Sequence, residues 1–330
     1  MKAAFIQETG PPSNLVYGDL PVPVPQPDEI LVDVGAVAVN PIDTYIRSGM
    51  IAMPLPEPFI VGCDFAGTVS AIGAGVTRFK TGDRVWGSNQ GLLGRQGTFA
   101  EKIAVKEAFA YASPSAQSDE NMAALSLVCI TAHLGLCQRA HLKAGETLFV
   151  SGGAGGVGSA VIQIAKAIGA RVIASAGSED RMEICREMGA DIVVNHRTDQ
   201  VDQCISENTQ NGVDVYWETQ RQPNFETSIG ALAENGRMVV MAGRDACPPF
   251  PVGPFYVKGC SLVGFAMFKA SPQQQQQSAE DINTWAANGQ LKANIGRRFP
   301  LSEAAAAHQL QEENTIHSAG TLHGKIVLSP

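Results

Sequence analysis

The chain has 330 residues, which is enough for about two domains that each bury a hydrophobic core. Its formal net charge of -8 at pH 7 disfavours a general binder of nucleic acid or of acidic membranes. No apolar run in the sequence approaches the ~18 residues that span a bilayer, and the N-terminus lacks the pattern of a signal peptide. The seven cysteines are scattered and include no C-x-x-C pair, which predicts reduced thiols in a cytoplasmic protein.

The first part of the chain predicts short strands separated by glycines and prolines, a pattern typical of a compact β-barrel or sandwich. The expected strands cover residues 3–7, 29–39, 67–72, 83–86 and 98–105. Between the first two, prolines alternate with other residues over positions 21–27. Two interpretations are open, a proline-rich linker or recognition segment and an extended crossing between two strands. The crossing is favoured because the run is short and a strand follows at once.

From about residue 119, strands alternate with helices, which predicts a parallel, doubly wound sheet. An apolar helix over residues 122–138 comes first. A later helix has Ser178 as its N-cap and ends at Gly189. Right-handed crossovers put the carboxyl ends of parallel strands at one edge of the sheet, so we expect ligand contacts there. The expected strands cover residues 147–150, 171–175, 191–194, 213–217, 237–242 and 261–265.

After residue 265 the alternation ends. Five consecutive glutamines, residues 273–277, indicate a polar helix start rather than a disordered tract, because the run is short and a helical pattern follows. A helix with Ser302 as its cap is expected over residues 301–311, and a last strand at 325–328 returns to the first domain. The predicted protein is therefore of the α/β class. Its domains are a β-barrel, residues 1–118 and 266–330, and a nucleotide-binding domain, residues 119–265.

A glycine-rich turn lies between the strand at residues 147–150 and the helix that follows it. Gly153, Gly155 and Gly158 form the pattern G-x-G-x-x-G in a strand–turn–helix context. The missing side chains let the backbone approach a pyrophosphate, and the helix N-terminus offers unpaired N–H groups and a positive dipole end. A dinucleotide site is the favoured interpretation, and a tight turn that the fold itself requires is the alternative.

Seven segments, in order along nearly the whole chain, carry a family resemblance. They are VAVNPIDTYIRSG (37–49), GCDFAGTVSAIGAGV (62–76), FKTGDRVW (79–86), GGAGGVG (152–158), NHR (195–197), GRMVVMAGR (236–244) and GKIVL (324–328). With them the chain resembles the zinc-independent quinone oxidoreductases of the medium-chain dehydrogenase/reductase superfamily, the zeta-crystallin-like branch in particular. The resemblance implies a GroES-like barrel domain that carries catalysis and a Rossmann domain with a doubly wound parallel sheet. It also implies hydride transfer from a nicotinamide cofactor.

The resemblance also bears on zinc, because many members of the superfamily are zinc alcohol dehydrogenases. Where those enzymes place their first cysteine ligand and their G-H-E segment, this chain has Asn40 and the run Gly62, Cys63 and Asp64. A catalytic zinc needs three protein ligands and a structural zinc needs four. Cys63 and Cys129 lack a third soft ligand, so we expect core thiols. We predict no metal, which favours an electron-poor acceptor over alcohol oxidation.

The choice of cofactor depends on the end of the second strand, where NAD enzymes carry Asp or Glu about 20 residues after the glycine motif. That place holds Ser175, and Arg181 follows in the next helix. Arginine suits a 2′-phosphate through its planar, multi-donor head, whereas the alternative is a surface ion pair with Glu179 or Asp180. His196 matches the family histidine at the adenosine end of the cofactor, and is otherwise a plain loop residue. We predict NADPH rather than NADH.

By resemblance, Asn40 and Tyr45 flank the nicotinamide and the substrate entrance, and they are the candidate catalytic residues. An amide and a phenol can hydrogen-bond an acceptor oxygen. The alternatives are turn chemistry at Asn40-Pro41 and an ordinary barrel-edge aromatic at Tyr45. The family comparison also places Lys325 near the cofactor diphosphate. The candidate cofactor-binding residues are Thr131, Ala154, Gly155, Gly156, Val157, Gly177, Ser178, Arg181, His196, Asn224, Met241, Ala242, Gly243, Arg244, Phe265, Ala266, Met267 and Lys325.

The predicted reaction is hydride transfer from NADPH to a small apolar quinone or enone. Two alternatives stay open. One is an enoyl-thioester or alkenal reductase on the same fold, and the other is a non-catalytic, NADPH-linked RNA-binding or structural role, which the acidic balance disfavours. A homodimer or homotetramer is expected, with residues 261–265 as the candidate pairing strand, and no membrane partner. The sequence leaves open the proton donor and whether electrons move singly or in pairs.

Overall fold

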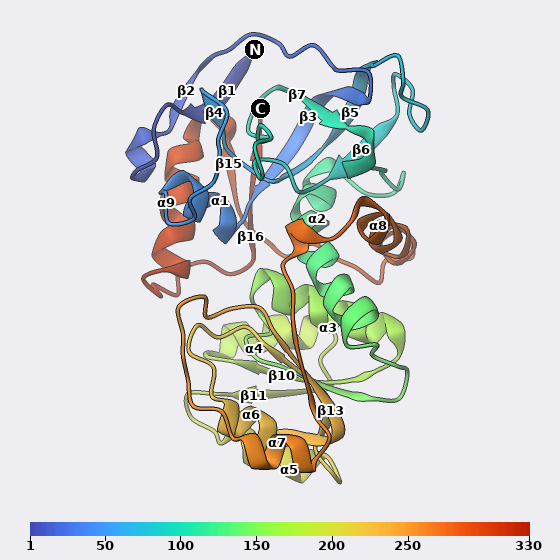
Figure 1. Cartoon of the computed structure of the whole chain (residues 1–330), viewed down its shortest axis with the longest axis vertical. Coiled ribbons are helices and arrows are strands. Elements are labelled where there is room, and N and C mark those ends of the chain that lie inside the picture. The colour runs from blue at the N-terminus through green and yellow to red at the C-terminus, as the bar shows by residue number, and fades with distance from the viewer. The chain divides into compact units, whose positions relative to one another are not determined.

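A computed structural model describes all 330 residues, and they form two compact units (Figure 1). The first, named here the β-rich unit, comprises Met1–Leu127 and Ala270–Pro330. The second, named the parallel-sheet unit, comprises Val128–Lys269. The first division lies within helix α2 (Asp119–His133), and the domain limits predicted from the sequence precede both divisions. The β-rich unit is therefore discontinuous along the chain.

Two sheets build the β-rich unit. The larger has the strand order β15-β16-β3-β5-β6-β8, with β7 also paired to β3, and the smaller has the order β2-β1-β4. All pairs are antiparallel except β15 with β16. The strands are β1 Lys2–Ile6, β2 Val16–Asp19, β3 Glu29–Val39, β4 Phe59–Ile60, β5 Asp64–Ile72, β6 Arg84–Gly87, β7 Lys102–Lys106, β8 Ala110–Ala112, β15 Ile295–Pro300 and β16 Lys325–Ser329.

Strand β3 brings the two ends of this unit together. Its first half alternates buried apolar residues with more exposed ones, and its last four residues, 36–39, are all buried. Strand β16 lies antiparallel to this buried end, with Ile326 opposite Val39. This register carries Lys325, the first residue of β16, to the place beside Asn40, which directly follows β3.

The structure differs from the predicted strands mainly at short ones. Strands β2, β4, β8 and β15 are not predicted from the sequence. They lie at the ends of their sheets and span at most six residues each. The strand expected at 98–105 is shorter, because Ala100 makes only an isolated bridge to Ala3 and regular pairing begins at Lys102. The proline run joins β2 to β3 without regular structure, which confirms a crossing between two strands.

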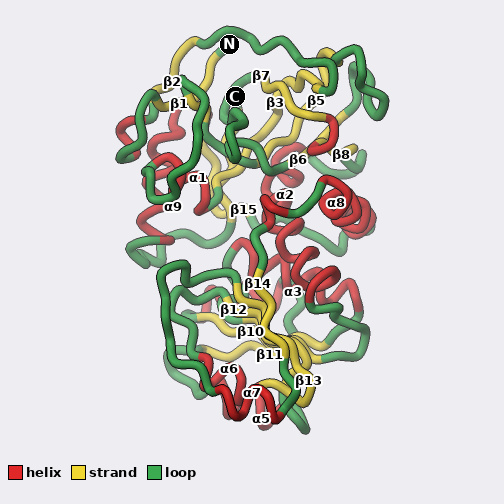
Figure 2. The backbone as a smooth tube through the Cα atoms, viewed as in Figure 1, coloured by secondary structure: helices red, strands yellow, loops and turns green.

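The parallel-sheet unit contains one six-stranded sheet with the order β11-β10-β9-β12-β13-β14, and every strand pair is parallel. Helices α3 and α4 cover one face, and α5, α6 and α7 form the layer on the other (Figures 1 and 2). The predicted doubly wound sheet is confirmed. The elements are β9 Thr147–Val150, α3 Gly156–Ile168, β10 Arg171–Ala176, α4 Glu179–Glu187, β11 Ile192–Asn195, α5 Val201–Asn208, β12 Val213–Glu218, α6 Phe225–Ala231, β13 Leu232–Val240, α7 Val252–Val257 and β14 Ser261–Gly264.

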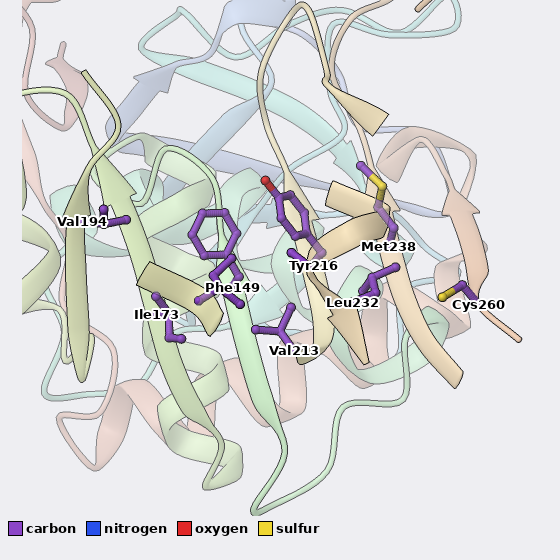
Figure 3. Close-up of a cluster of buried hydrophobic side chains, with 10 residues drawn as sticks. Phe149, Ile173, Val194, Val213, Tyr216, Leu232, Met238 and Cys260 are labelled. Atoms are coloured by element: carbon purple, nitrogen blue, oxygen red, sulfur yellow. The ribbon is translucent and has the colours of Figure 1, made fainter. Parts of the chain in front are cut away.

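A cluster of apolar side chains fills the space between this sheet and the layer of α5, α6 and α7 (Figure 3). Phe149 of β9, Ile173 of β10, Val194 of β11 and Tyr216 of β12 come from neighbouring strands, and Ile205 comes from α5. The rings of Phe149 and Tyr216 pack with centroids 4.7 Å apart. Each such buried side chain contributes about 1.5–3 kcal/mol to stability, so the cluster holds the strand ends in a fixed arrangement.

The helices near the C-terminus test two local predictions. Helix α8 (Pro272–Ala287) contains the glutamine run, and Ser271 with Gln274 forms a capping box at its start, which confirms the polar helix start. Helix α9 begins only at Ala304 and ends at Thr315. Residues 301–303 form a separate 3-10 turn, so the prediction of Ser302 as the cap of this helix is wrong.

One helix is apolar over a length that could span a membrane. Helix α2 continues through a π-helical segment, Leu134–Arg139, which gives a helix of 21 residues over 119–139. By length and composition alone this helix could cross a membrane, so the expectation that no apolar run approaches that length is wrong. Of its most apolar window, 78% is buried inside the protein, as in the core helix of a folded protein.

Helix α9 carries a buried histidine. His308 is fully buried, its ring meets Phe99 edge-on at 5.7 Å, and neither ring nitrogen has a hydrogen-bond partner. Arg47, buried at the end of α1 (Pro41–Arg47), donates hydrogen bonds to the Gly10 carbonyl and the Glu312 carboxylate. Burial, with a smaller effect of the Arg47 charge, lowers the pKa of His308 from 6.5 to about 3.

The lowered pKa of His308 predicts a loss of stability in mild acid. The unfolded chain binds a proton at His308 near pH 6.5 and the folded chain only near pH 3, so stability falls as the pH drops through this window. We expect the free energy of unfolding of the native chain to fall by about 2 kcal/mol more between pH 7 and pH 5 than that of His308→Phe. Urea denaturation of both proteins at the two pH values measures the difference. Equal losses would contradict the assignment.

Candidate active site at the carboxyl edge of the parallel sheet

All six strands of the parallel-sheet unit end at one edge, because every pair is parallel. The chain runs outward from β9 to β10 and β11, then returns to β12 on the other side of β9. In sheets of this kind ligands bind outside the carboxyl ends, where the strand order reverses. The glycine loop follows β9 and therefore lies at this point.

The three motif glycines have different roles in the turn. A Cβ at Gly158 would lie 2.2 Å from the Gly152 carbonyl oxygen, and one at Gly153 would lie 2.9 Å from the Cys185 sulfur. These two glycines are required by the packing of the turn itself. Gly155 is exposed, and a Cβ there would meet only the Gly152 oxygen, at 3.4 Å. The fold does not demand glycine at 155, where the N–H donates to the Gly152 carbonyl at 3.1 Å, and the missing side chain leaves the start of α3 uncovered.

The end of β10 has Ser175 in place of an acidic residue, and this serine hydrogen-bonds the glycine loop. The Ser175 hydroxyl accepts a hydrogen bond from the Gly152 N–H at 3.2 Å, and the Ser175 carbonyl accepts one from the Gly153 N–H at 2.9 Å. On the other side, the Thr219 hydroxyl donates to the Ser151 carbonyl at 2.6 Å. The turn is thus held by both neighbouring strands, and no carboxylate stands where NAD enzymes bind the ribose hydroxyls.

A basic corner forms where β10 and β11 end; we use this name for Arg181, His196 and Arg197. A Cβ at Gly177 would lie 3.0 Å from His196 Nε2 and 3.1 Å from Arg197 Nε, so both side chains cross this glycine. Burial lowers the pKa of His196, and the charges of Arg197 and Arg181 lower it further. The three groups therefore share one small region and can face an anion together.

Glu179, one of the two acids in the surface-pair alternative for Arg181, also pairs with another arginine of α4. Arg186 donates to the Glu179 carboxylate at 2.8 Å and to the Glu183 carboxylate at 2.8 Å. Ser178 occupies the N-cap of α4 as predicted, but its side chain makes no capping hydrogen bond.

The other half of the edge carries the loops after β12 and β13. Asn224 is the N-cap of α6, and its Oδ1 accepts a hydrogen bond from the Thr227 N–H at 3.1 Å, so its side chain already serves the fold. Gly243 has φ +77°, and a Cβ there would lie 2.8 Å from the Arg221 carbonyl oxygen. The loop that contains Met241, Ala242, Gly243 and Arg244 therefore touches the loop that leads to Asn224.

The remaining cofactor candidates of this unit lie on two segments. Phe265 follows β14 and meets Trp217 edge-on with ring centroids 6.5 Å apart. Ala266 precedes a 3-10 turn, Met267–Lys269, in which Met267 is buried. Thr131 lies on α2 and is buried, away from any strand end in sequence. The edge thus collects the glycine loop, the basic corner and the two touching loops.

The catalytic candidates belong to the β-rich unit. Asn40 is the N-cap of α1, and Tyr45 is half-buried on the same helix. The buried Asn40 side chain donates from Nδ2 to Asp64 Oδ2 at 2.7 Å and accepts at Oδ1 from Lys325 Nζ at 2.5 Å. Lys325 Nζ also donates to the Val39 carbonyl at 2.8 Å. The hydrogen-bond partners of Lys325 thus lie within its own unit, and one of them is the catalytic candidate Asn40.

Two buried carboxyls surround this network. Asp64 accepts a further hydrogen bond from the Ser88 hydroxyl at 2.6 Å, and Asp43 accepts one from the Asn40 N–H at 2.8 Å. Burial raises the pKa of Asp64, although Lys325, Ser88 and Asn40 oppose the shift. Burial and the nearby Asp64 raise the pKa of Asp43 to about 7.

The positions that hold zinc in related dehydrogenases carry side chains that contact one another here. Asn40 and Asp64 are joined by a hydrogen bond, and the Lys325 ammonium lies 4.0 Å from Asp64 Oδ2. Burial and both carboxyls raise the pKa of Cys63, so it is a thiol rather than the thiolate that binds metals. No group of three or more His, Cys, Asp or Glu side chains is arranged to hold a metal ion. A second cation beside Lys325 would be repelled.

Three residues of these two regions are missed by the sequence analysis as site residues. Arg197 belongs to the NHR segment, and its place directly after His196 at a strand end is a usable signal. Asp64 is named from the sequence only as part of the run that stands where zinc enzymes have G-H-E. Ser88 carries no signal, because only the pairing of β5 with β6 brings it to Asp64.

Known proteins match this chain over nearly its full length. Family models match at residues 26–115, described as alcohol dehydrogenase GroES-like domain, and at residues 156–284, described as zinc-binding dehydrogenase. The quinone oxidoreductase of Pongo abelii is 34% identical over 330 residues, covering 99% of this chain and 97% of that relative.

Two solved structures match this chain, and each match covers 100% of both chains. The Escherichia coli quinone oxidoreductase complexed with NADPH has a TM-score of 0.86 at 26% identity. A structure described as an NAD-dependent alcohol dehydrogenase has a TM-score of 0.89 at 31% identity. The fold class, a GroES-like domain with a Rossmann-like parallel sheet, is confirmed. The chain is an oxidoreductase and belongs to the quinone oxidoreductase-like family of the medium-chain dehydrogenase/reductase superfamily.

Proposed function

We propose that this oxidoreductase uses NADPH to reduce a quinone or a related α,β-unsaturated carbonyl without a metal ion. When bound, NADPH supplies a hydride from C4 of its nicotinamide. The observation that carries the proposal is the edge of the parallel sheet, where an open glycine loop and the basic corner occur together. The loop suits a diphosphate, and the basic corner suits a phosphate on the adenosine ribose.

The basic corner supports NADPH over NADH. Arg181 and Arg197 offer planar, multi-donor heads to a phosphate, and His196 is mainly neutral at pH 7, so it offers a hydrogen bond rather than a charge. The hydroxyl and the carbonyl of Ser175 both accept hydrogen bonds from the glycine loop. No carboxylate lies at the end of this strand to bind the ribose hydroxyls of NADH. The E. coli relative was solved as a complex with NADPH, which agrees with this assignment.

The β-rich unit supports reduction without zinc. The Lys325 ammonium and the protonated Cys63 thiol leave no set of metal ligands at the positions that related dehydrogenases use. Without a Lewis acid, an alcohol would keep a high pKa, so the favoured substrates are electron-poor acceptors. We assign Asn40 to hydrogen-bond the acceptor oxygen, and Tyr45 to the same region as a second donor.

A substrate panel tests this proposal against its alternatives. Purified protein is incubated with NADPH and quinones, simple enones or acyl-CoA enoyl thioesters, and NADPH consumption is followed. We expect turnover with quinones and simple enones. Turnover with enoyl thioesters alone would replace the proposal by the enoyl-thioester reductase. NADPH-dependent RNA binding without any turnover would support the non-catalytic role.

We also propose that the chain self-associates through β14. This strand ends its sheet, so one side of it has no partner strand in the chain. Val252, Tyr256 and Val257 of α7 and Leu262 of β14 are exposed by 63%, 69%, 74% and 44%. Exposed apolar side chains and an open strand edge are typical of a contact surface. Light scattering should give the mass of a dimer or a tetramer, and a monomer would contradict this.

A further inference from the structure

Lys325 is a buried cation that lies beside Asn40. It is 7% exposed, and the pairing of β16 with the end of β3 fixes its backbone beside Asn40. Its ammonium donates hydrogen bonds to the Val39 carbonyl and to Asn40 Oδ1, at 2.8 and 2.5 Å. Asp64, 4.0 Å away and fully buried, is its counter-charge.

These partners determine which way the Asn40 amide lies. An ammonium only donates hydrogen bonds and a carboxylate only accepts them. The amide oxygen therefore belongs on the side of Lys325 and the amide nitrogen on the side of Asp64, as the structure has them. The flipped amide would put its oxygen against the Asp64 carboxylate and its N–H groups against the ammonium, which leaves both contacts repulsive.

The fixed amide has one hydrogen left to give. Asn40 is 1% exposed, its Nδ2 carries two hydrogens, and Asp64 takes one of them. No acceptor within the chain takes the second. A buried donor without a partner costs free energy, which an oxygen atom of a bound ligand would recover. The amide therefore has a donor, and not an acceptor, left to offer to a ligand oxygen.

We propose that Lys325 is a positioning residue, which holds the Asn40 amide so that its second N–H donates to the oxygen of the hydride acceptor. This inference rests on the proposed function, because the acceptor oxygen is that of the quinone or enone. Lys325 acts through Asn40, where a hydrogen bond strengthens as negative charge develops on that oxygen. It does not contribute to the affinity for NADPH, which differs from the diphosphate contact that the family comparison implies.

Lys325→Met, Lys325→Arg and Asn40→Ala separate these roles. We expect Lys325→Met to lower kcat for a quinone by about tenfold, while the dissociation constant for NADPH, measured by fluorescence, changes less than about twofold. Lys325→Arg should recover part of kcat, because arginine still donates to Asn40. The double variant Lys325→Met with Asn40→Ala should have a kcat no lower than that of Asn40→Ala alone, because the two substitutions remove the same function. Lys102→Met, which removes an exposed lysine paired with Asp33, is the matched control.

The outcomes are distinct. A weakened NADPH affinity at unchanged kcat would assign Lys325 to the diphosphate and overturn the inference, and so would additive losses in the double variant. A wild-type protein that reduces no acceptor would overturn the proposed function and this inference with it. Because Lys325→Met leaves Asp64 buried without its counter-charge, Lys325→Met with Asp64→Asn serves if the single variant does not fold. The same loss of kcat at unchanged NADPH affinity is expected there, and its absence contradicts the inference.

Discussion

Replacing both Arg181 and Arg197 by alanine is expected to raise the KM for NADPH about a hundredfold and to leave the KM for NADH nearly unchanged. The two guanidinium groups and His196 form the basic corner at the ends of β10 and β11. Charge-assisted hydrogen bonds to a phosphate contribute about 1.5–3 kcal/mol each, and NADH has no 2′-phosphate to lose them. The variant should therefore lose its preference for NADPH through KM while kcat with a quinone is retained.

Arg186→Ala is the control for this pair. Arg186 lies on the same helix as Arg181 and is paired with Glu179 and Glu183. Its removal should change neither cofactor constant. Each single variant, Arg181→Ala and Arg197→Ala, should raise the KM for NADPH by about tenfold. Equal losses with NADPH and NADH in the double variant would place these arginines outside a 2′-phosphate site.

The second large effect concerns the glycine loop. Gly158→Ala is expected to lower the free energy of unfolding by about 3 kcal/mol. The new Cβ would lie 2.2 Å from the Gly152 carbonyl oxygen and 2.9 Å from the Gly153 Cα, and backbone atoms of a tight turn cannot move aside cheaply. Urea denaturation of the variant and of the native chain at one pH measures the loss.

Gly155→Ala is the matched comparison, because it adds the same methyl group to the same loop. Gly155 has φ −72°, which alanine adopts readily, and its Cβ would meet only one atom, at 3.4 Å. We expect stability within about 0.5 kcal/mol of the native chain and an NADPH dissociation constant raised about tenfold. If Gly155→Ala binds NADPH as the native chain does, the loop is a structural turn and not the diphosphate site.

The sequence alone predicts the parts of the fold whose signals are local. The glycine motif, the apolar runs of β9 to β14 and the helix periodicity each lie within one short segment, and the structure has those elements in the predicted order. The short strands β2, β4, β8 and β15 escape prediction, since pairing across the sheet stabilises them more than their own composition does. Ser302 fails as a cap because a 3-10 turn precedes the helix there.

The candidate site divides in the same way. Arg181 is predicted from its distance to the glycine motif, and His196 from the family resemblance of the NHR segment. The contact of Lys325 with Asn40 joins residues 285 positions apart and depends on the register of β16 against β3. No local pattern encodes that register, so sequence reasoning could name both residues but not their hydrogen bond.

We propose that hydride passes from NADPH to a quinone on this chain without zinc. The most direct test of this proposal is a single turnover with a quinone, using NADPH or NADPH deuterated at C4, on protein treated with a chelator and checked for metal content. We expect full oxidation of NADPH by metal-free protein, with a clear primary isotope effect on the chemical step. Activity that appears only after zinc is restored, or a chemical step without an isotope effect, would contradict it.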